Sequence, residues 1–164
     1  MPMKMKTKLF KLSTNTVIGF IGGFLAIYLL LSMTEWTNHL WIMAPFGASC
    51  VLAFGVSDSP LAQPRNIIGG HFIASMVGII FKNYVGDTKI SIAIAVGLSI
   101  ALMLITKTTH PPAGADPLVV LLTTEVIGWK FLLFPVLSGA LIIVILAFIL
   151  NNVPKERKYP TFWI

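Results

Sequence analysis

Apolar residues in this chain gather in long continuous runs that are separated by short polar or proline-rich stretches. Three runs, at 16–33, 90–106 and 131–150, come close to the roughly 20 residues that a helix needs to cross about 30 Å of hydrocarbon. A fourth run, at 66–81, is shorter and begins beside Arg65. The pattern predicts an all-α fold, a polytopic membrane helix bundle.

Two shorter apolar pieces, at 40–56 and 111–124, are interrupted by proline and glycine. Within them, 45–49 and 112–116 share a Pro-x-Gly-Ala-polar pattern, and each piece lies between two of the longer runs. This arrangement predicts a twofold internal repeat of span, broken or re-entrant segment, and span. Short segments broken by proline or glycine at corresponding positions of two halves are the best sequence indication of a transporter's binding site.

The predicted organisation is a single membrane domain over 1–164. Repeat 1 covers about 15–82 and repeat 2 about 88–150, and polar tails at 1–14 and 151–164 flank them.

The number of spans stays open between four and six. Re-entrant segments give four spans and place Arg65 and Lys107 opposite the termini, whereas crossing segments give six spans, inverted halves, and both residues beside the termini. Either way, nine basic residues lie on the side of the termini and three on the other. Because Lys and Arg collect on the cytoplasmic side, we expect a multi-pass protein of the cell (inner) membrane with both termini cytoplasmic.

The composition agrees with a membrane protein. Hydrophobic residues make up 56% of the chain and charged residues only 11%, and the mean hydropathy is +0.87, whereas soluble domains carry about 25% charged residues. The net charge of +6 comes largely from basic residues near the two ends, so we expect no nucleic-acid partner. The single Cys50 lies in an apolar run and is expected to be a small buried side chain.

Small residues recur at every fourth position and predict close helix packing, which in lipid depends on small side chains. These ladders are Gly70, Ala74 and Gly78; Ala93, Gly97 and Ala101; and the pair Gly19 and Gly23. Because six short apolar pieces enclose little space, we expect these faces to support a homo-oligomer. Aromatic residues at the predicted span ends are expected to anchor the chain in membrane lipid, and they are Trp36, Trp41, Trp129, Tyr159 and Trp163.

A helix that begins inside a membrane exposes its first N–H groups, which act as about half a positive charge and suit an anion. Pro45 and Pro112 can occupy such a first turn without removing a needed donor, and Gly47 and Gly114 let a ligand approach the backbone. Two such starts facing each other would form a compact pocket for a small anion. The alternative is a pair of ordinary kinks packed in protein.

Ionisable side chains occur beside the second break. His110 could donate to an anion or carry a proton, or it could be a buried histidine that bonds a neighbouring carbonyl. Asp116, followed by proline, is expected to cap its own helix in preference to catalysis or cation binding, and Ser49 could cap the first segment in the same way. His39 and His71 are expected to be structural or interfacial.

Arg65 enters the next span after a proline-bracketed loop, where it could draw anions into a vestibule or reach toward lipid headgroups. The candidate substrate-binding set is Pro45, Gly47, Ala48, Ser49, Arg65, Asn66, Thr109, His110, Pro112, Gly114, Ala115 and Asp116. The sequence contains no hydrolase, redox or phosphate-loop motif, and no His and carboxylate cluster at metal-ligand spacing. We therefore expect neither enzyme activity nor a metal or other cofactor.

Three motifs occur in an order that carries a family resemblance. They are Pro45-Phe46-Gly47-Ala48-Ser49, the stretch 59–66 leading to Gly69-Gly70-His71, and His110-Pro111-Pro112-Ala113-Gly114-Ala115. Together they resemble the HPP family of multi-span proteins of bacterial and chloroplast membranes, closely over about 41–122. Some members of that family are nitrite transporters, which implies nitrite or a similar small monovalent anion as the substrate.

Asp116 departs from this resemblance, because an uncharged residue would be expected there in relatives that move nitrite. The carboxyl group must be protonated or turned away, or this protein carries something else.

The leading hypothesis is a transporter or channel for a small inorganic anion bound between the two breaks, with Arg65 attracting it and His110 contributing a hydrogen bond or a proton. The main rival is a non-transporting membrane module that serves as a scaffold or partner for another protein. A third alternative is an intramembrane enzyme that uses His110 and Asp116 as a general base pair.

Overall fold

The computed structural model describes residues 3–163, with side chains described from residue 12 onward. This part of the chain contains six α-helices and no strand. The helices are α1 (Met3–Thr37), α2 (Pro45–Cys50), α3 (Pro64–Tyr84), α4 (Lys89–Ile105), α5 (Asp116–Leu122) and α6 (Ser138–Asn151). The all-α prediction is therefore confirmed for the described residues.

Short 3₁₀ and π turns adjoin these helices. A π turn at Val51–Gly55 continues α2, and a 3₁₀ turn at Pro111–Ala115 leads into α5. Two further turns, Trp129–Leu132 and Leu133–Leu137, lead into α6, and the 3₁₀ turn Pro60–Ala62 precedes α3. The two shorter apolar pieces thus form helices whose regular hydrogen bonding is interrupted, as their proline and glycine content predicts.

Three helical stretches among the described residues are long and apolar enough to cross a membrane, and they are Leu12–Thr37, Pro64–Tyr84 and Trp129–Asn151. The prediction that 66–81 is the short run and 90–106 a full one is wrong, because α3 has 21 residues and α4 only 17. α3 begins early because Pro64 occupies its first turn, where a missing N–H is not needed. α4 ends before Lys107, which adopts a left-handed conformation with a φ of 56°.

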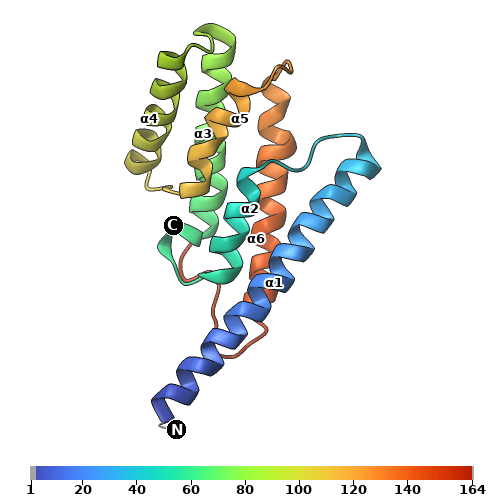
Figure 1. Cartoon of the computed structure of the whole chain (residues 1–164), viewed down its shortest axis with the longest axis vertical. Helices are drawn as coiled ribbons and strands as arrows, with labels where there is room; N and C mark the ends of the chain where they lie inside the picture. Colours follow the sequence, from blue (N-terminus) through green and yellow to red (C-terminus); the bar gives the residue numbers. More distant parts are fainter. Residues whose placement is uncertain (1–2, 164) are drawn as a thin grey trace.

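The chain reverses direction at each successive helix, so that α1, α3 and α5 run one way and α2, α4 and α6 run the other (Figure 1). One end of the bundle carries the loop 56–63 and the C-terminal tail, and we call it the terminal end. The short helices α2 and α5 each continue the chain toward the opposite end instead of returning it. This path matches the six-segment alternative with inverted halves, and the twofold repeat itself remains a prediction.

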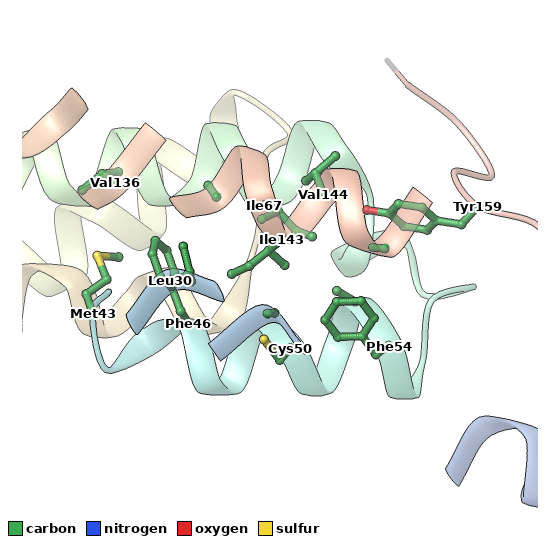
Figure 2. Close-up of a cluster of buried hydrophobic side chains, with 14 of the residues drawn as sticks. Leu30, Met43, Phe46, Cys50, Phe54, Ile67, Val136, Ile143, Val144 and Tyr159 are labelled. Carbon is green, nitrogen blue, oxygen red and sulfur yellow. The ribbon is translucent and has the colours of Figure 1, made fainter. Parts of the chain in front are cut away.

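The largest apolar core lies between α1, α2, α6 and the start of α3 (Figure 2). Phe46, Cys50 and Phe54, from α2 and its π turn, belong to one buried cluster with Leu30 of α1 and Ile143 of α6. Cys50 is a small buried side chain, as predicted. Because lipid provides little hydrophobic drive between helices, this core fixes the first short segment mainly through van der Waals packing.

The ladder of Gly70, Ala74 and Gly78 is the face of α3 against which the second short segment packs. A Cβ on Gly70 would lie 2.7 Å from the Cβ of His110, and a Cβ on Gly78 would lie 3.1 Å from the Cα of Pro117. Close packing is therefore confirmed at this ladder.

The ladder on α4 does not pack closely within the chain, and the pair on α1 does so only at Gly19, where a Cβ would lie 4.0 Å from the Cα of Gly55. Ala93, Gly97 and Ala101 are exposed on α4, and a Cβ on Gly97 or on Gly23 would meet nothing within 4 Å. Their role in an oligomer remains a prediction.

The tail after α6 folds back onto the terminal end. Tyr159 is 1% exposed and its hydroxyl donates to the carbonyl of Ala62 at 2.9 Å, so the prediction that it anchors the chain in lipid is wrong. Burial raises the pKa of this phenol, which keeps the hydroxyl a donor. Arg157 donates through Nη1 to Asn15 of α1 and through Nη2 to the carbonyl of Phe54, each at 2.8 Å. These bonds tie the tail to α1 and to the end of the first short segment.

Candidate functional site

Five fully buried polar side chains meet inside the bundle, and they are Ser49, His71, Ser75, His110 and Asp116. We call this set the buried polar cluster. Its members come from α2, from α3, and from the segment 110–116 that leads into α5. Ionisable side chains at such positions in membrane proteins are rare, and they are paired or functional when they occur.

A continuous line of hydrogen bonds runs through the cluster. The Oδ2 atom of Asp116 lies 2.8 Å from Nδ1 of His71, and Nε2 of His71 lies 2.7 Å from Oγ of Ser49. The same Oγ lies 2.8 Å from Nε2 of His110. The line ends where Nδ1 of His110 lies 2.8 Å from the carbonyl oxygen of Leu61. All four distances are those of full hydrogen bonds.

The local sequence of α3 explains how this helix contributes two members. His71 and Ser75 are four residues apart, so their side chains lie on one face of the helix. Ser75 donates to Oδ2 of Asp116 at 3.0 Å, the oxygen that also faces His71. Gly70, next to His71, leaves the space that His110 fills.

Ring contacts hold the two imidazoles in place. The ring of Phe46 stands edge-on to His71, with centroids 5.1 Å apart and planes at 89°. The rings of His71 and His110 lie 5.0 Å apart at 69°. Both imidazoles therefore have their nitrogens directed to hydrogen-bond partners and their remaining surface in contact with other rings.

The cluster is closed by apolar side chains toward one end of the bundle and leads to polar backbone at the other. About one helix turn beyond it, Ile79 of α3, Val120 of α5 and Leu132 form a buried apolar layer. In the opposite direction the line of hydrogen bonds reaches Leu61, in the loop 56–63 at the terminal end. The structure therefore connects the cluster to the terminal end.

Arg65 and Asn66 lie at the start of α3 and do not join the cluster. Arg65 donates through Nη2 to the carbonyl of Thr106 at 2.7 Å, and Asn66 donates through Nδ2 to the carbonyl of Thr109 at 2.8 Å. Asn66 is buried, and its Oδ1 is one of two buried side-chain atoms without a partner in the described part of the chain. These bonds tie α3 to the loop before the second short segment and leave one buried acceptor free.

The two breaks lie side by side. Pro45 and Pro112 are buried at the two starts, and both border one shallow groove together with Ala48 and Ala115. The groove is lined almost entirely by apolar residues, so its surface does not suit an anion. Of the remaining predicted residues, Ser49, His110 and Asp116 are in the cluster, Thr109 is half-buried, Gly114 is half-buried, and Gly47 is exposed.

The first backbone donors of the two short segments are occupied or missing. The N–H groups of Phe46 and Gly47 donate to carbonyl groups of the turn before them. At the second start the two prolines have no N–H, and that of Ala113 donates to the carbonyl of His110. The free N–H groups expected for an anion receptor are therefore absent at these positions, and the donors nearby are imidazole and hydroxyl groups.

Three sequence-based assignments change. Asp116 does not cap its own helix, because its carboxyl group bonds His71 and Ser75. Ser49 lies near the end of α2 instead of at its start, so it is not a cap. His71, expected to be structural or interfacial, is the centre of the cluster. Its spacing of four residues from Ser75, within an apolar run, is the signal that could have identified it.

The comparisons with known proteins agree with a membrane protein. The sequence matches a family described as HPP, transmembrane region, over residues 11–160. A transmembrane protein of Dictyostelium discoideum is 42% identical over 128 residues, which cover 74% of this chain and 45% of that protein. A second transmembrane protein of the same organism is 38% identical over 150 residues, which cover 88% and 48%. The chain thus spans less than half the length of either relative. No solved structure matches it.

Proposed function

Because the chain belongs to the HPP transmembrane family, we propose that it is a transporter or channel that carries a small inorganic anion, nitrite, across the membrane. The observation that carries this proposal is the buried polar cluster. Ionisable groups inside a membrane bundle are costly and mark ion or proton pathways. The cluster lies beside the two interrupted segments, which is where secondary transporters bind their substrates.

The distribution of charge supports an anion as the substrate. In the six-segment arrangement, nine of the 12 Lys and Arg residues stand at the terminal end, and Arg65 is the one at the start of α3. Basic residues gathered at one end of the bundle raise the local concentration of anions there. Inside the bundle, His71 and His110 carry ring N–H groups that would bond an entering anion in place of their present acceptors, Asp116, Ser49 or the carbonyl of Leu61.

The negative charge of Asp116 is compatible with an anionic substrate because the carboxyl group is paired with His71. Two like charges 4 Å apart repel by about 4 kcal/mol at an effective dielectric constant of 20, so a bare carboxylate would exclude an anion nearby. His71 lies 2.8 Å from this carboxyl group. A proton shared by the two side chains makes the pair neutral and removes that repulsion.

The order of contacts from Asp116 through His71 to Ser49 is that of a hydrolase triad, and yet we propose no enzyme activity. The hydroxyl group of Ser49 is fully buried and also bonds His110. In a triad the serine donates its hydrogen to one histidine, whereas here a second imidazole on the same hydroxyl competes for that hydrogen.

We also propose that the protein resides in the cell (inner) membrane, with both termini in the cytoplasm, and forms a homo-oligomer. The excess of basic residues at the terminal end supports the orientation. The exposed ladder of Ala93, Gly97 and Ala101 on α4 supports the assembly.

Flux measurements on the purified full chain in liposomes test the transport proposal. We expect nitrite uptake above that of empty vesicles, and a loss of that uptake in Ser49→Ala and His71→Gln. Ser99→Ala is the matched control, because Ser99 is equally buried and donates to the carbonyl of Ala95 in its own helix. Empty vesicles correct for nitrous acid, which crosses lipid unaided. No flux of nitrite, nitrate or formate above empty vesicles would contradict anion transport and favour the scaffold alternative.

A further inference from the structure

The line of hydrogen bonds between Asp116 and Leu61 requires a definite number of hydrogens. It contains four contacts between heavy atoms, and each needs one hydrogen between its two atoms. At one end a carbonyl group only accepts, so Nδ1 of His110 carries a hydrogen. In a neutral His110, Nε2 is then an acceptor.

With Asp116 ionised and both histidines neutral, the groups hold only three hydrogens, one on each imidazole and one on Ser49. The two imidazole hydrogens are used at the ends of the line, on the carboxylate and on the carbonyl. The single hydroxyl hydrogen of Ser49 can then serve only one of the two Nε2 atoms. The other contact, at 2.7 or 2.8 Å, would bring two lone pairs together. The geometry therefore requires one additional hydrogen.

Two arrangements supply this hydrogen at the same net charge. Either His71 is an imidazolium beside an ionised Asp116, or Asp116 is protonated and donates to Nδ1 of His71, whose Nε2 carries the hydrogen. In both, Ser49 accepts from His71 and donates to His110. The two arrangements differ by the position of one proton along a 2.8 Å contact. The alternative donation from Ser49 to the carbonyl of Pro45, at 3.3 Å, would leave both Nε2 atoms in need of a hydrogen and raises the requirement further.

We propose that this additional proton is the coupling ion, so that the cluster takes up one proton with each anion and the protein is a proton–anion symporter. The inference rests on the proposed function. Without the proton the cluster carries a net charge of −1 and repels an anion, and with it the cluster is neutral, so that an entering anion can replace Ser49 or Asp116 as the acceptor for an imidazole N–H. Proton binding therefore precedes anion binding.

The net charge of the site is set by the side chains of the buried polar cluster, because the charged side chains of α3 and α4 lie near helix ends or are exposed. α2 contributes Ser49, α3 contributes His71 and Ser75, and the segment 110–116 contributes His110 and Asp116. The cationic side chains of α3 bond carbonyl groups near its two ends, Arg65 that of Thr106 and Lys82 that of Thr123. The described residues of α6 include no charged side chain, and the one on α4, Lys89, is exposed.

The position of the proton also links protonation to packing. Ser49 belongs to α2, whereas its two imidazole partners belong to α3 and to the segment before α5. Loss of the proton leaves one of these contacts without a hydrogen, which breaks a link between two elements. The line leads to Leu61 at the terminal end and stops at the apolar layer of Ile79, Val120 and Leu132, so the hydrogen-bonded connection of the cluster runs toward the terminal end.

Asp116→Asn keeps the shape of the side chain but changes the number of hydrogens it carries, so this variant tests the additional proton without altering the geometry of the site. The Asn amide can donate to Nδ1 of His71, so that His71 donates to Ser49 and Ser49 to His110 without any additional proton. The second amide hydrogen faces Ser75, which then accepts in place of donating, so that every contact is satisfied in a neutral cluster. We expect this variant to fold and to lack the mobile proton.

Flux measurements with a trapped pH indicator test the coupling. An inward nitrite gradient should acidify the interior of wild-type vesicles beyond that of empty ones, and an imposed membrane potential should leave nitrite uptake unchanged because the pair is neutral. Asp116→Asn should lose the acidification, and Ser99→Ala should keep it. Nitrite uptake without proton movement, or uptake that follows the membrane potential, would overturn the inference and leave the proposed function standing. Absence of nitrite flux in the wild type would overturn the proposed function instead.

A spectroscopic measurement tests the additional proton independently of transport. The full chain, with ¹⁵N-labelled histidine, is placed in lipid nanodiscs near neutral pH, and the imidazole resonances are read together with the infrared band of a protonated carboxyl group. We expect either an imidazolium or a protonated carboxyl group in the wild type and neither in Asp116→Asn. Two neutral cluster histidines beside an ionised Asp116 would overturn the inference whether or not nitrite is transported.

Discussion

Ser49 holds two imidazole rings with one hydroxyl group, at 2.7 Å and 2.8 Å. A buried polar atom that loses its partner costs about 1–3 kcal/mol, because no water replaces the lost bond. Removal of this hydroxyl group leaves a nitrogen on each of two buried rings without a partner. The contribution of Ser49 to stability should therefore exceed that of a serine that bonds only its own helix.

We predict that Ser49→Ala lowers the free energy of unfolding by about 2 kcal/mol or more, measured by denaturant titration in detergent micelles. Ser99→Ala, equally buried, loses one bond to the carbonyl of Ala95 and should cost less than about 1 kcal/mol. Equal losses in the two variants would show that the cluster adds no stability beyond a local helix bond.

The sequence identified three of the five members of the cluster, and missed Ser75 and the central residue, His71. Ser49 and Asp116 are the matching polar positions of the two Pro-x-Gly-Ala-polar motifs, and the structure places them on the two nitrogens of one imidazole, that of His71. His71 was missed because these partners are 22 and 45 residues away in the chain. The spacing of residues along the sequence predicts which side chains share a face of one helix. It does not predict contacts between helices, because these depend on how the chain folds back.

At the scale of helices, the fit between α3 and the second short segment depends on Gly70. A Cβ there would lie 2.7 Å from the Cβ of His110 and 3.0 Å from the carbonyl oxygen of Thr108. Both distances are too short for contact without a shift of the segment that carries His110.

We predict that Gly70→Ala destabilises the protein by about 1–3 kcal/mol, the usual cost of an overpacked contact. Gly97→Ala is the matched control, because Gly97 is also in a helix and a Cβ there would meet nothing within 4 Å. Alanine is the better helix former by about 1 kcal/mol at both positions, so the difference between the variants measures packing. Denaturant titration in micelles gives both values, and a Gly70→Ala protein as stable as Gly97→Ala would contradict the close approach.

The lengths of the helices show what hydropathy can and cannot predict. A run of apolar residues indicates contact with lipid. In α3, however, half of the residues in the most apolar stretch are buried inside the bundle. Its buried face can therefore carry Asn66, His71 and Ser75, which made the run look short in the sequence. α4 has a continuous apolar run and several exposed residues, and the sequence overestimated it relative to α3.

At the scale of the whole molecule, the path of the chain favours one of the two topologies that charge left open, the six-segment one. Both alternatives place nine basic residues beside the termini and three opposite them, so the positive-inside rule gives the same orientation for either. The reversal of direction at every helix, α2 and α5 included, distinguishes them (Figure 1). The number of crossings follows from where the breaks send the chain, which depends on tertiary packing and not on charge.

Single cysteines introduced at Lys89 and Lys107 test this topology, because the two alternatives place these residues on opposite sides of the membrane. Both side chains are exposed, and Cys50→Ala removes the chain's one native thiol. With termini in the cytoplasm, a membrane-impermeant maleimide added to intact cells should label the thiol of Lys89→Cys and not that of Lys107→Cys. Permeabilised cells, in which both should react, control for reactivity. The four-span alternative gives the reverse pattern, since re-entrant segments return Lys107 to the outer side and Lys89 to the cytoplasm. That reverse pattern, obtained together with protection of a Lys155→Cys thiol, would refute the six-segment path and the inverted halves on which the convergence of the two breaks depends.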